Sequence, residues 1–205
     1  MVHDIPAHYR KKVTKEEINL LPIRSWTGPI HIITTDEQAI KAVSKLKKHK
    51  VLGFDTETRP VFRKGQSRDP ALLQLADAND AYIFQLKRFR EREALRSLLE
   101  KKSILKVGVA LKQDIRQLQP ILPFRDAGFV DLAVCARNAS IPSQGLRTLS
   151  AAFLGCRISK RAQCSNWDRS NLADFQIKYA ATDAWISREI YLKMKEFDVV
   201  DRRFN

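Results

Sequence analysis

Four acidic residues and one tyrosine have the types and the spacing expected of a site for divalent cations. Asp55 and Glu57 lie two residues apart at the end of an apolar run, and Asp114 follows a second apolar run. Tyr179 and Asp183 lie four residues apart in a segment with helical periodicity. Carboxylate oxygens are the hard ligands that Mg²⁺ and similar cations prefer. In a chain with surplus positive charge, such a group of carboxylates suggests cleavage of phosphodiesters.

The acid pair is the most informative part of this pattern. Side chains two apart in a strand point to the same face, so Asp55 and Glu57 are expected to lie together. Neighbouring carboxylates repel and are costly to desolvate, and a bound cation offsets that cost. The plain alternative is a strand end with solvated acids.

The other three residues are less informative one by one. Asp114 alone is typical of an acid near a helix start, where the helix dipole favours it. Tyr179 and Asp183 would share one helix face and, taken alone, could be a surface hydrogen-bonding pair. The order and structural context of all five residues together predict a metal site.

The charge balance indicates a polyanionic partner. The 205 residues fit one domain, and 37 Lys and Arg against 23 Asp and Glu give a formal charge of +14. Nucleic acid is the favoured partner.

A membrane is not expected, because no apolar run approaches the roughly 20 residues that a span needs. The first residues lack the apolar core of a signal peptide, so a cytoplasmic or nuclear protein is expected. Cys135, Cys156 and Cys164 have neither the even number nor the close spacing of a disulfide framework or zinc site, and Cys135 is expected to be buried.

The pattern of apolar residues predicts one α/β domain over residues 29–200, after a basic N-terminal arm (1–28) and before a short tail (201–205). The arm is expected to contain at most a short helix and to wrap onto the domain. Strands alternating with helices indicate a mixed sheet. The expected strands are 29–34, 51–54, 71–76, 81–86, 104–109 and 128–130, with a hairpin turn at 77–80. The expected helices include one capped by Thr35 or Asp36, 111–118, one capped by Asp131, and 177–197.

These motifs resemble a known family. Phe54-Asp55-Thr56-Glu57, Asp114 after a Val-Gly strand, and Tyr179-x-x-x-Asp183 look like the three motifs of the DEDD exonuclease superfamily in its tyrosine variant. Further stretches resemble the Werner-syndrome-type and ribonuclease D branch of 3′→5′ exonucleases: Thr58-Arg59-Pro60, 71–76, Cys164-Ser165-Asn166-Trp167 and 179–184. The resemblance covers about residues 30 to 195 and implies a ribonuclease H-like fold, a five-stranded mixed sheet with helices on both faces. The sequence ends soon after the third motif, whereas helical nucleic-acid-binding domains follow it in ribonuclease D.

The resemblance also implies roles for the five residues in hydrolysis with two Mg²⁺ or Mn²⁺ ions. Asp55 would bridge both ions, and Glu57 and Asp183 would hold the ion that activates water. Asp114 would serve the other ion through water, and Tyr179 would orient the attacking water. The product would be a nucleoside 5′-monophosphate.

Substrate contacts are predicted from position. Thr58 could contact the terminal nucleotide through its backbone, and Gln74 and Lys112 could either flank the cleft or be ordinary strand and helix residues. Trp167 could stack on a base, although an anchor for its loop is favoured. Further candidates are Arg157, Lys160 and Arg161, which could follow phosphates, and Phe62, Arg63 and Lys64, in the loop after the second expected strand.

The sequence is therefore interpreted as a metal-dependent 3′→5′ exonuclease, with DNA favoured over RNA. An RNA-trimming enzyme of ribonuclease D type has the same chemistry. A catalytically silent nucleic-acid-binding module would be expected to have lost acids, whereas all four are present with the tyrosine. A basic scaffold for an acidic protein would leave the carboxylates unexplained.

Overall fold

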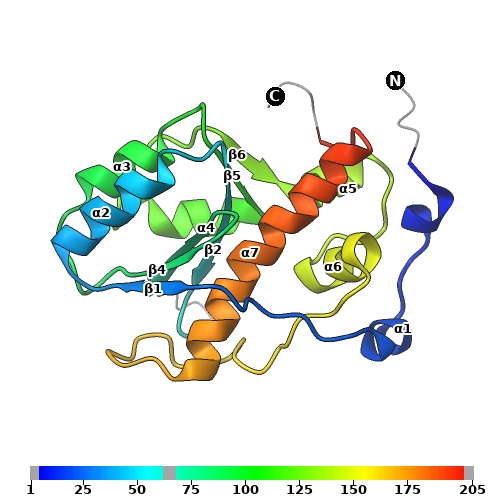
Figure 1. The fold of residues 1–205 in the computed structure, drawn as a ribbon, viewed down its shortest axis with the longest axis horizontal. Coiled ribbons are helices and arrows are strands. Elements are labelled where there is room, and N and C mark those ends of the chain that lie inside the picture. The colour runs from blue at the N-terminus through cyan, green and yellow to red at the C-terminus, as the bar shows by residue number, and fades with distance from the viewer. Residues whose placement is uncertain (1–4, 62–67, 201–205) are drawn as a thin grey trace.

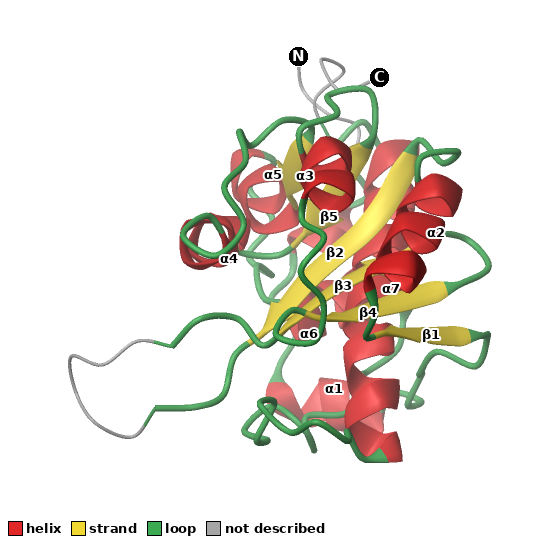
Figure 2. Cartoon of the chain, turned by 90° about the vertical axis from the view of Figure 1, so that its left-hand side faces the viewer, coloured by secondary structure: helices red, strands yellow, loops and turns green. Residues whose placement is uncertain are grey.

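The computed structural model describes residues 5–61 and 68–200, and a six-stranded mixed sheet lies at its centre (Figures 1 and 2). The strand order is β1-β4-β3-β2-β5-β6. β3 runs antiparallel to β2 and β4, and the other pairs are parallel. The strands are β1 Ile30–Ile33, β2 Val51–Glu57, β3 Leu72–Ala76, β4 Ala81–Gln85, β5 Leu105–Gly108 and β6 Phe129–Asp131.

The mixed sheet and the hairpin between β3 and β4 confirm the sequence-based prediction, and the sheet has the six strands that the apolar pattern predicts, one more than the five that the resemblance implies. The additional strand is β1 at the sheet edge. It pairs in parallel with β4, from Ile30 opposite Ala81 to Ile33 opposite Phe84. The fold implied by the resemblance therefore holds, with one more edge strand.

Two helices begin directly after the residues that the sequence marks as caps. The Thr35 hydroxyl accepts a hydrogen bond from the Gln38 amide at the start of α2, and Asp131 accepts from the Ala133 amide at the start of α5. The last helix begins at Asp174, three residues before the predicted start. The helices are η1 (3₁₀) Ala7–Arg10, α1 Lys15–Leu20, α2 Asp36–Leu46, α3 Glu93–Leu99, α4 Leu111–Leu118, α5 Leu132–Asn138, α6 Leu146–Leu154 and α7 Asp174–Glu196.

Helices cover both faces of the sheet. Leu52 and Phe54 of β2 belong to an apolar cluster with α2, α3 and α4 on one face. On the other face, Val107 of β5 packs with α5, α6 and α7. α7 crosses the sheet diagonally in Figure 1 and contacts β2, β3, β4 and β5. This helix carries Tyr179 and Asp183, so its contact with β2 brings the predicted site together.

The N-terminal segment lies against the domain. Ile5, Tyr9, Ile18 and Trp26 are buried, and the Tyr9 ring stacks on Phe153 with ring centroids 4.6 Å apart. The segment contains the short helices η1 and α1. It is therefore a packed part of the structure over the residues described.

Two further sequence-based expectations concern the cysteines and membrane helices. The described residues contain no disulfide, and Cys135 is half-buried rather than buried, because it lies at the edge of the cluster around α5 and α7. Cys156 is buried and Cys164 is exposed. Within residues 5–61 and 68–200, no helix is both long and apolar enough to cross a membrane.

Candidate active site

A glycine allows α7 to approach β2 closely enough to form the site. A Cβ atom added to Gly53 would lie 1.8 Å from the backbone oxygen of Ala184, so only glycine allows this contact. Asp183 precedes Ala184, and Asp55 lies two residues after Gly53 on the same strand face. The close contact between the two backbones therefore places Asp183 beside Asp55.

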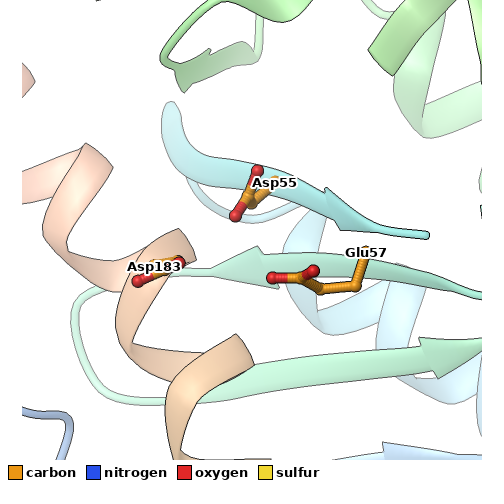
Figure 3. A group of neighbouring side chains, drawn as sticks. All are labelled: Asp55, Glu57 and Asp183. Atoms are coloured by element: carbon orange, nitrogen blue, oxygen red, sulfur yellow. The ribbon is translucent and has the colours of Figure 1, made fainter. Parts of the chain in front are cut away.

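Three of the predicted acids meet between β2 and α7. One carboxylate oxygen from each of Asp55, Glu57 and Asp183 lies within 4.8 Å of the others, and Figure 3 shows the three side chains grouped together. Asp183 is only 5% exposed, and its Oδ1 has no hydrogen-bond partner among the described residues. A buried oxygen without a donor and two adjacent carboxylates fit a divalent cation, which would supply the missing interaction.

The acids affect one another's protonation. Burial raises the pKa of Asp55 well above its ordinary value, and the neighbouring Asp183 and Asp114 raise it further. Burial, followed by Asp55, Asp183 and Asp114, raises the pKa of Glu57 to about 10. Burial raises the pKa of Asp183 to about 7, although a hydrogen bond from Tyr179 opposes this shift. Without a cation, the group therefore retains protons at neutral pH, and cation binding is expected to release them.

Asp114 lies beside this group in the first turn of α4. Its Oδ1 accepts a hydrogen bond of 2.5 Å from the Thr56 hydroxyl, and burial raises the pKa of its carboxyl. The start of α4 is in turn held by Asp131, whose two oxygens accept hydrogen bonds of 3.0 Å each from the Ala110 and Leu111 amides. Thr56 and Asp131 therefore position the fourth acid, a role that the sequence analysis did not assign to either.

Tyr179 lies one helical turn before Asp183 and lines the same cleft. Burial is the largest cause that raises the pKa of the Tyr179 hydroxyl, followed by the charges of Asp183 and Glu57. The hydroxyl therefore remains protonated near neutral pH and can donate a hydrogen bond. Its ring lies 5.9 Å from that of the buried Trp167, measured between centroids.

Asp55, Glu57 and Asp183, but not Asp114, are among the residues that line a cleft of about 560 Å³. Other parts of its lining come from α1, the start of α6 and the segment 158–163, which contribute Lys15, Asn19, Arg147 and Lys160. The sequence analysis singled out only Lys160 among these four residues. The others belong to segments that carry no catalytic motif, so their place in the cleft depends on the tertiary fold.

The predicted phosphate-contacting residues separate in the structure. Lys160 is exposed and lines the cleft. Arg161 lines an adjoining cavity of about 270 Å³, where its guanidinium lies 5.2 Å from the ring centroid of Phe175. Arg157 is half-buried, and its Nε donates a hydrogen bond of 2.9 Å to the Leu21 carbonyl oxygen. Arg157 is therefore engaged in fixing the N-terminal segment.

The remaining candidates differ in exposure. Gln74 lies directly opposite Asp55 on β3 but is fully buried, and neither polar atom of its side chain has a partner among the described residues. Trp167 is 1% exposed and packs in an apolar cluster, as expected of an anchor. Thr58 is half-buried just after β2, and Lys112 is exposed on α4. Phe62, Arg63 and Lys64 lie outside the described residues.

Comparisons with known proteins agree with this geometry. A family model described as 3′-5′ exonuclease matches residues 30–197. The chain is 37% identical over 161 residues to exonuclease 3′-5′ domain-containing protein 2 of Drosophila melanogaster. The aligned region covers 74% of this chain and 27% of that protein. It is 30% identical over 164 residues to DNA polymerase I of Aquifex aeolicus, covering 80% of this chain and 27% of the polymerase. It is 28% identical over 167 residues to ribonuclease D of Gluconacetobacter diazotrophicus, covering 80% of this chain and 42% of that enzyme.

A solved structure supports the fold. The Nibbler EXO domain of Aedes aegypti matches with a TM-score of 0.77 at 23% identity, over 85% of this chain and 92% of that domain. Fold and site together define a ribonuclease H-like nuclease domain with a group of carboxylates suited to metal. The chain belongs to the 3′-5′ exonuclease family, in the DEDD superfamily. It spans about a quarter of the length of the first two relatives, 27% of each.

Proposed function

We propose that this protein removes nucleotides from the 3′ ends of nucleic acids by metal-dependent hydrolysis and releases nucleoside 5′-monophosphates. The observation that carries the proposal is the meeting of Asp55, Glu57 and Asp183 within 4.8 Å, in a chain whose family is 3′-5′ exonuclease. A silent binding module would not need three carboxylates at this separation, because their mutual repulsion only costs stability.

Two Mg²⁺ or Mn²⁺ ions are proposed as the cofactor, and they would supply charge stabilisation of the phosphorane and activation of water. Asp55, Glu57 and Asp183 are the residues that would hold them. Asp114, held by the Thr56 hydroxyl, would serve the second ion through water. Tyr179 keeps its proton and would orient the attacking water by donating a hydrogen bond, since its raised pKa makes it a poor base.

DNA is the favoured substrate. The match to a protein named DNA polymerase I, at 30% identity, supports it. The match to a protein named ribonuclease D, at 28% identity, supports RNA trimming as the second candidate. Both substrates present the same scissile phosphodiester, so the carboxylates serve either one.

A single assay tests the activity and the substrate. Single-stranded and duplex DNA and RNA oligonucleotides, labelled at the 5′ end, are incubated with Mg²⁺, Mn²⁺ or EDTA. A ladder that shortens from the 3′ end in the presence of metal is expected, together with loss of cleavage in EDTA and in Asp55→Asn. Asp174→Asn is the matched control, because it removes one charge at an exposed position of α7. Cleavage of a closed circular strand, or full activity in metal-free buffer, would contradict the proposal.

A further inference from the structure

The segment 14–25, here called the N-terminal strap, precedes the residues that match the family model, yet it lines the cleft that contains the carboxylates. Three of its residues, Lys15, Ile18 and Asn19, contribute to the lining. The Arg147 Nη2 of α6 donates a hydrogen bond of 2.6 Å to the Asn19 Oδ1, which joins the strap to the start of α6. The part of the wall that the strap supplies therefore lies outside the residues that the family model matches.

The strap is held firmly against the domain. Arg157 makes three hydrogen bonds with the strap. Its Nε donates to the Leu21 carbonyl oxygen at 2.9 Å, and its backbone amide donates to the Pro22 carbonyl oxygen at 3.0 Å. The carbonyl oxygen of Arg157 accepts the third, of 2.9 Å, from the Arg24 amide. Ile18 is 3% exposed and anchors α1. Just after the strap, the Trp26 amide donates a hydrogen bond of 3.0 Å to the hydroxyl of Thr182, the residue before Asp183. The position of the strap is thus fixed relative to the catalytic group.

Three cationic side chains line the cleft in addition to the carboxylates. Lys15, Arg147 and Lys160 line it, and none of them forms an ion pair with a described residue. The Arg147 Nε is buried and has no hydrogen-bond partner among those residues. Lys15 also occupies the first position of α1, where a cation is unfavourable to the helix dipole. The stability of α1 therefore does not account for a lysine at this position, whereas binding of an anionic ligand in the cleft does.

We propose that Lys15 of the strap and Arg147 of α6 bind backbone phosphates of the substrate strand on the 5′ side of the scissile bond. This inference rests on the proposed function. Guanidinium and ammonium groups are the side chains that bind phosphates in proteins.

The test compares Lys15→Gln with Lys12→Gln. Both lysines are exposed in the N-terminal segment, but among the two only Lys15 lines the cleft. Each protein is assayed on a single-stranded DNA 12-mer and on the p-nitrophenyl ester of thymidine 5′-monophosphate, which has no upstream phosphates. In Lys15→Gln, the ratio of the KM for the 12-mer to the KM for the ester should rise about two- to five-fold, the effect of one exposed ion pair. The slope of log affinity against log salt should become shallower by about 0.7, because one phosphate contact is lost.

Lys12→Gln should match the wild type in both measurements. Equal KM ratios and equal salt slopes in the two variants would overturn the assignment of the strap. If the wild type cleaves neither substrate, the proposed function fails, and the strap is then judged by fluorescence anisotropy with a 5′-labelled 12-mer. Weaker binding by Lys15→Gln than by Lys12→Gln would still support the phosphate contact, and equal binding would refute it. Circular dichroism spectra identical to that of the wild type establish that both variants fold.

Discussion

Asp183→Asn is expected to stabilise the protein in the absence of metal, although it should abolish activity. Burial raises the pKa of Asp183 from 3.8 to about 7. The unfolded chain therefore ionises this residue near pH 4, whereas the folded protein does so only near pH 7. Folding stability falls as the pH rises through this window, because the unfolded state has already lost the proton that the folded state keeps.

The size of the effect follows from the shift. A difference of about 3 pKa units lowers the free energy of unfolding by roughly 4 kcal/mol at pH 8. At pH 5 the loss is less than half of that. Asparagine keeps the shape of aspartate without the charge, so Asp183→Asn should recover part of this free energy of unfolding. For a chain of this size, each kcal/mol is worth about 2–4 °C in Tm. A rise of several degrees in EDTA at pH 8, and a clearly smaller rise at pH 5, is expected.

Urea and thermal unfolding in EDTA at both pH values would measure the effect. The matched control is Asp174→Asn, an exposed position in the first turn of the same helix, for which no such pH-dependent gain is expected. With Mn²⁺ the order should reverse, because the wild type gains stability from the cation and the variant lacks one ligand. Equal or lower stability of Asp183→Asn at pH 8 in EDTA would refute the reasoning that buried charge destabilises the metal-free site.

Three other substitutions separate ligand binding, packing and orientation. Tyr179→Phe removes only a hydroxyl, so titration calorimetry should show Mn²⁺ affinity retained while single-turnover rates fall by about 10²–10⁴-fold; equal loss of metal affinity would contradict the assigned role. Gly53→Ala places a Cβ against the Ala184 backbone, and denaturant unfolding should show a loss of at least about 1–3 kcal/mol, with reduced activity. Thr56→Val removes the donor to Asp114, so activity should fall by about 10–100-fold with little change in Tm; an unchanged rate would mean that Asp114 needs no orientation.

The parts of the fold that the sequence predicts are those set by local periodicity and capping. Helix α4 begins and ends at the predicted residues, and Thr35 and Asp131 cap the helices that follow them. The alternation of side chains along β2 and the four-residue spacing on α7 place the acids on facing surfaces, which the structure confirms. The extra strand β1 could be expected as a strand, but its addition to the sheet depends on pairing with β4, about 50 residues later.

The parts of the site that the sequence does not predict depend on contacts between distant residues. Asp131 is recognisable as a cap of α5, but its hydrogen bonds to the start of α4 reach back 20 residues and orient Asp114. The strap reaches the cleft through Arg157, which lies 136 residues beyond Leu21. No local pattern marks such a contact, because the strap has neither strand alternation nor a long helical stripe. Local spacing thus predicts where the acids for the chemistry meet, whereas the wall assigned to the substrate strand is built by tertiary contacts alone.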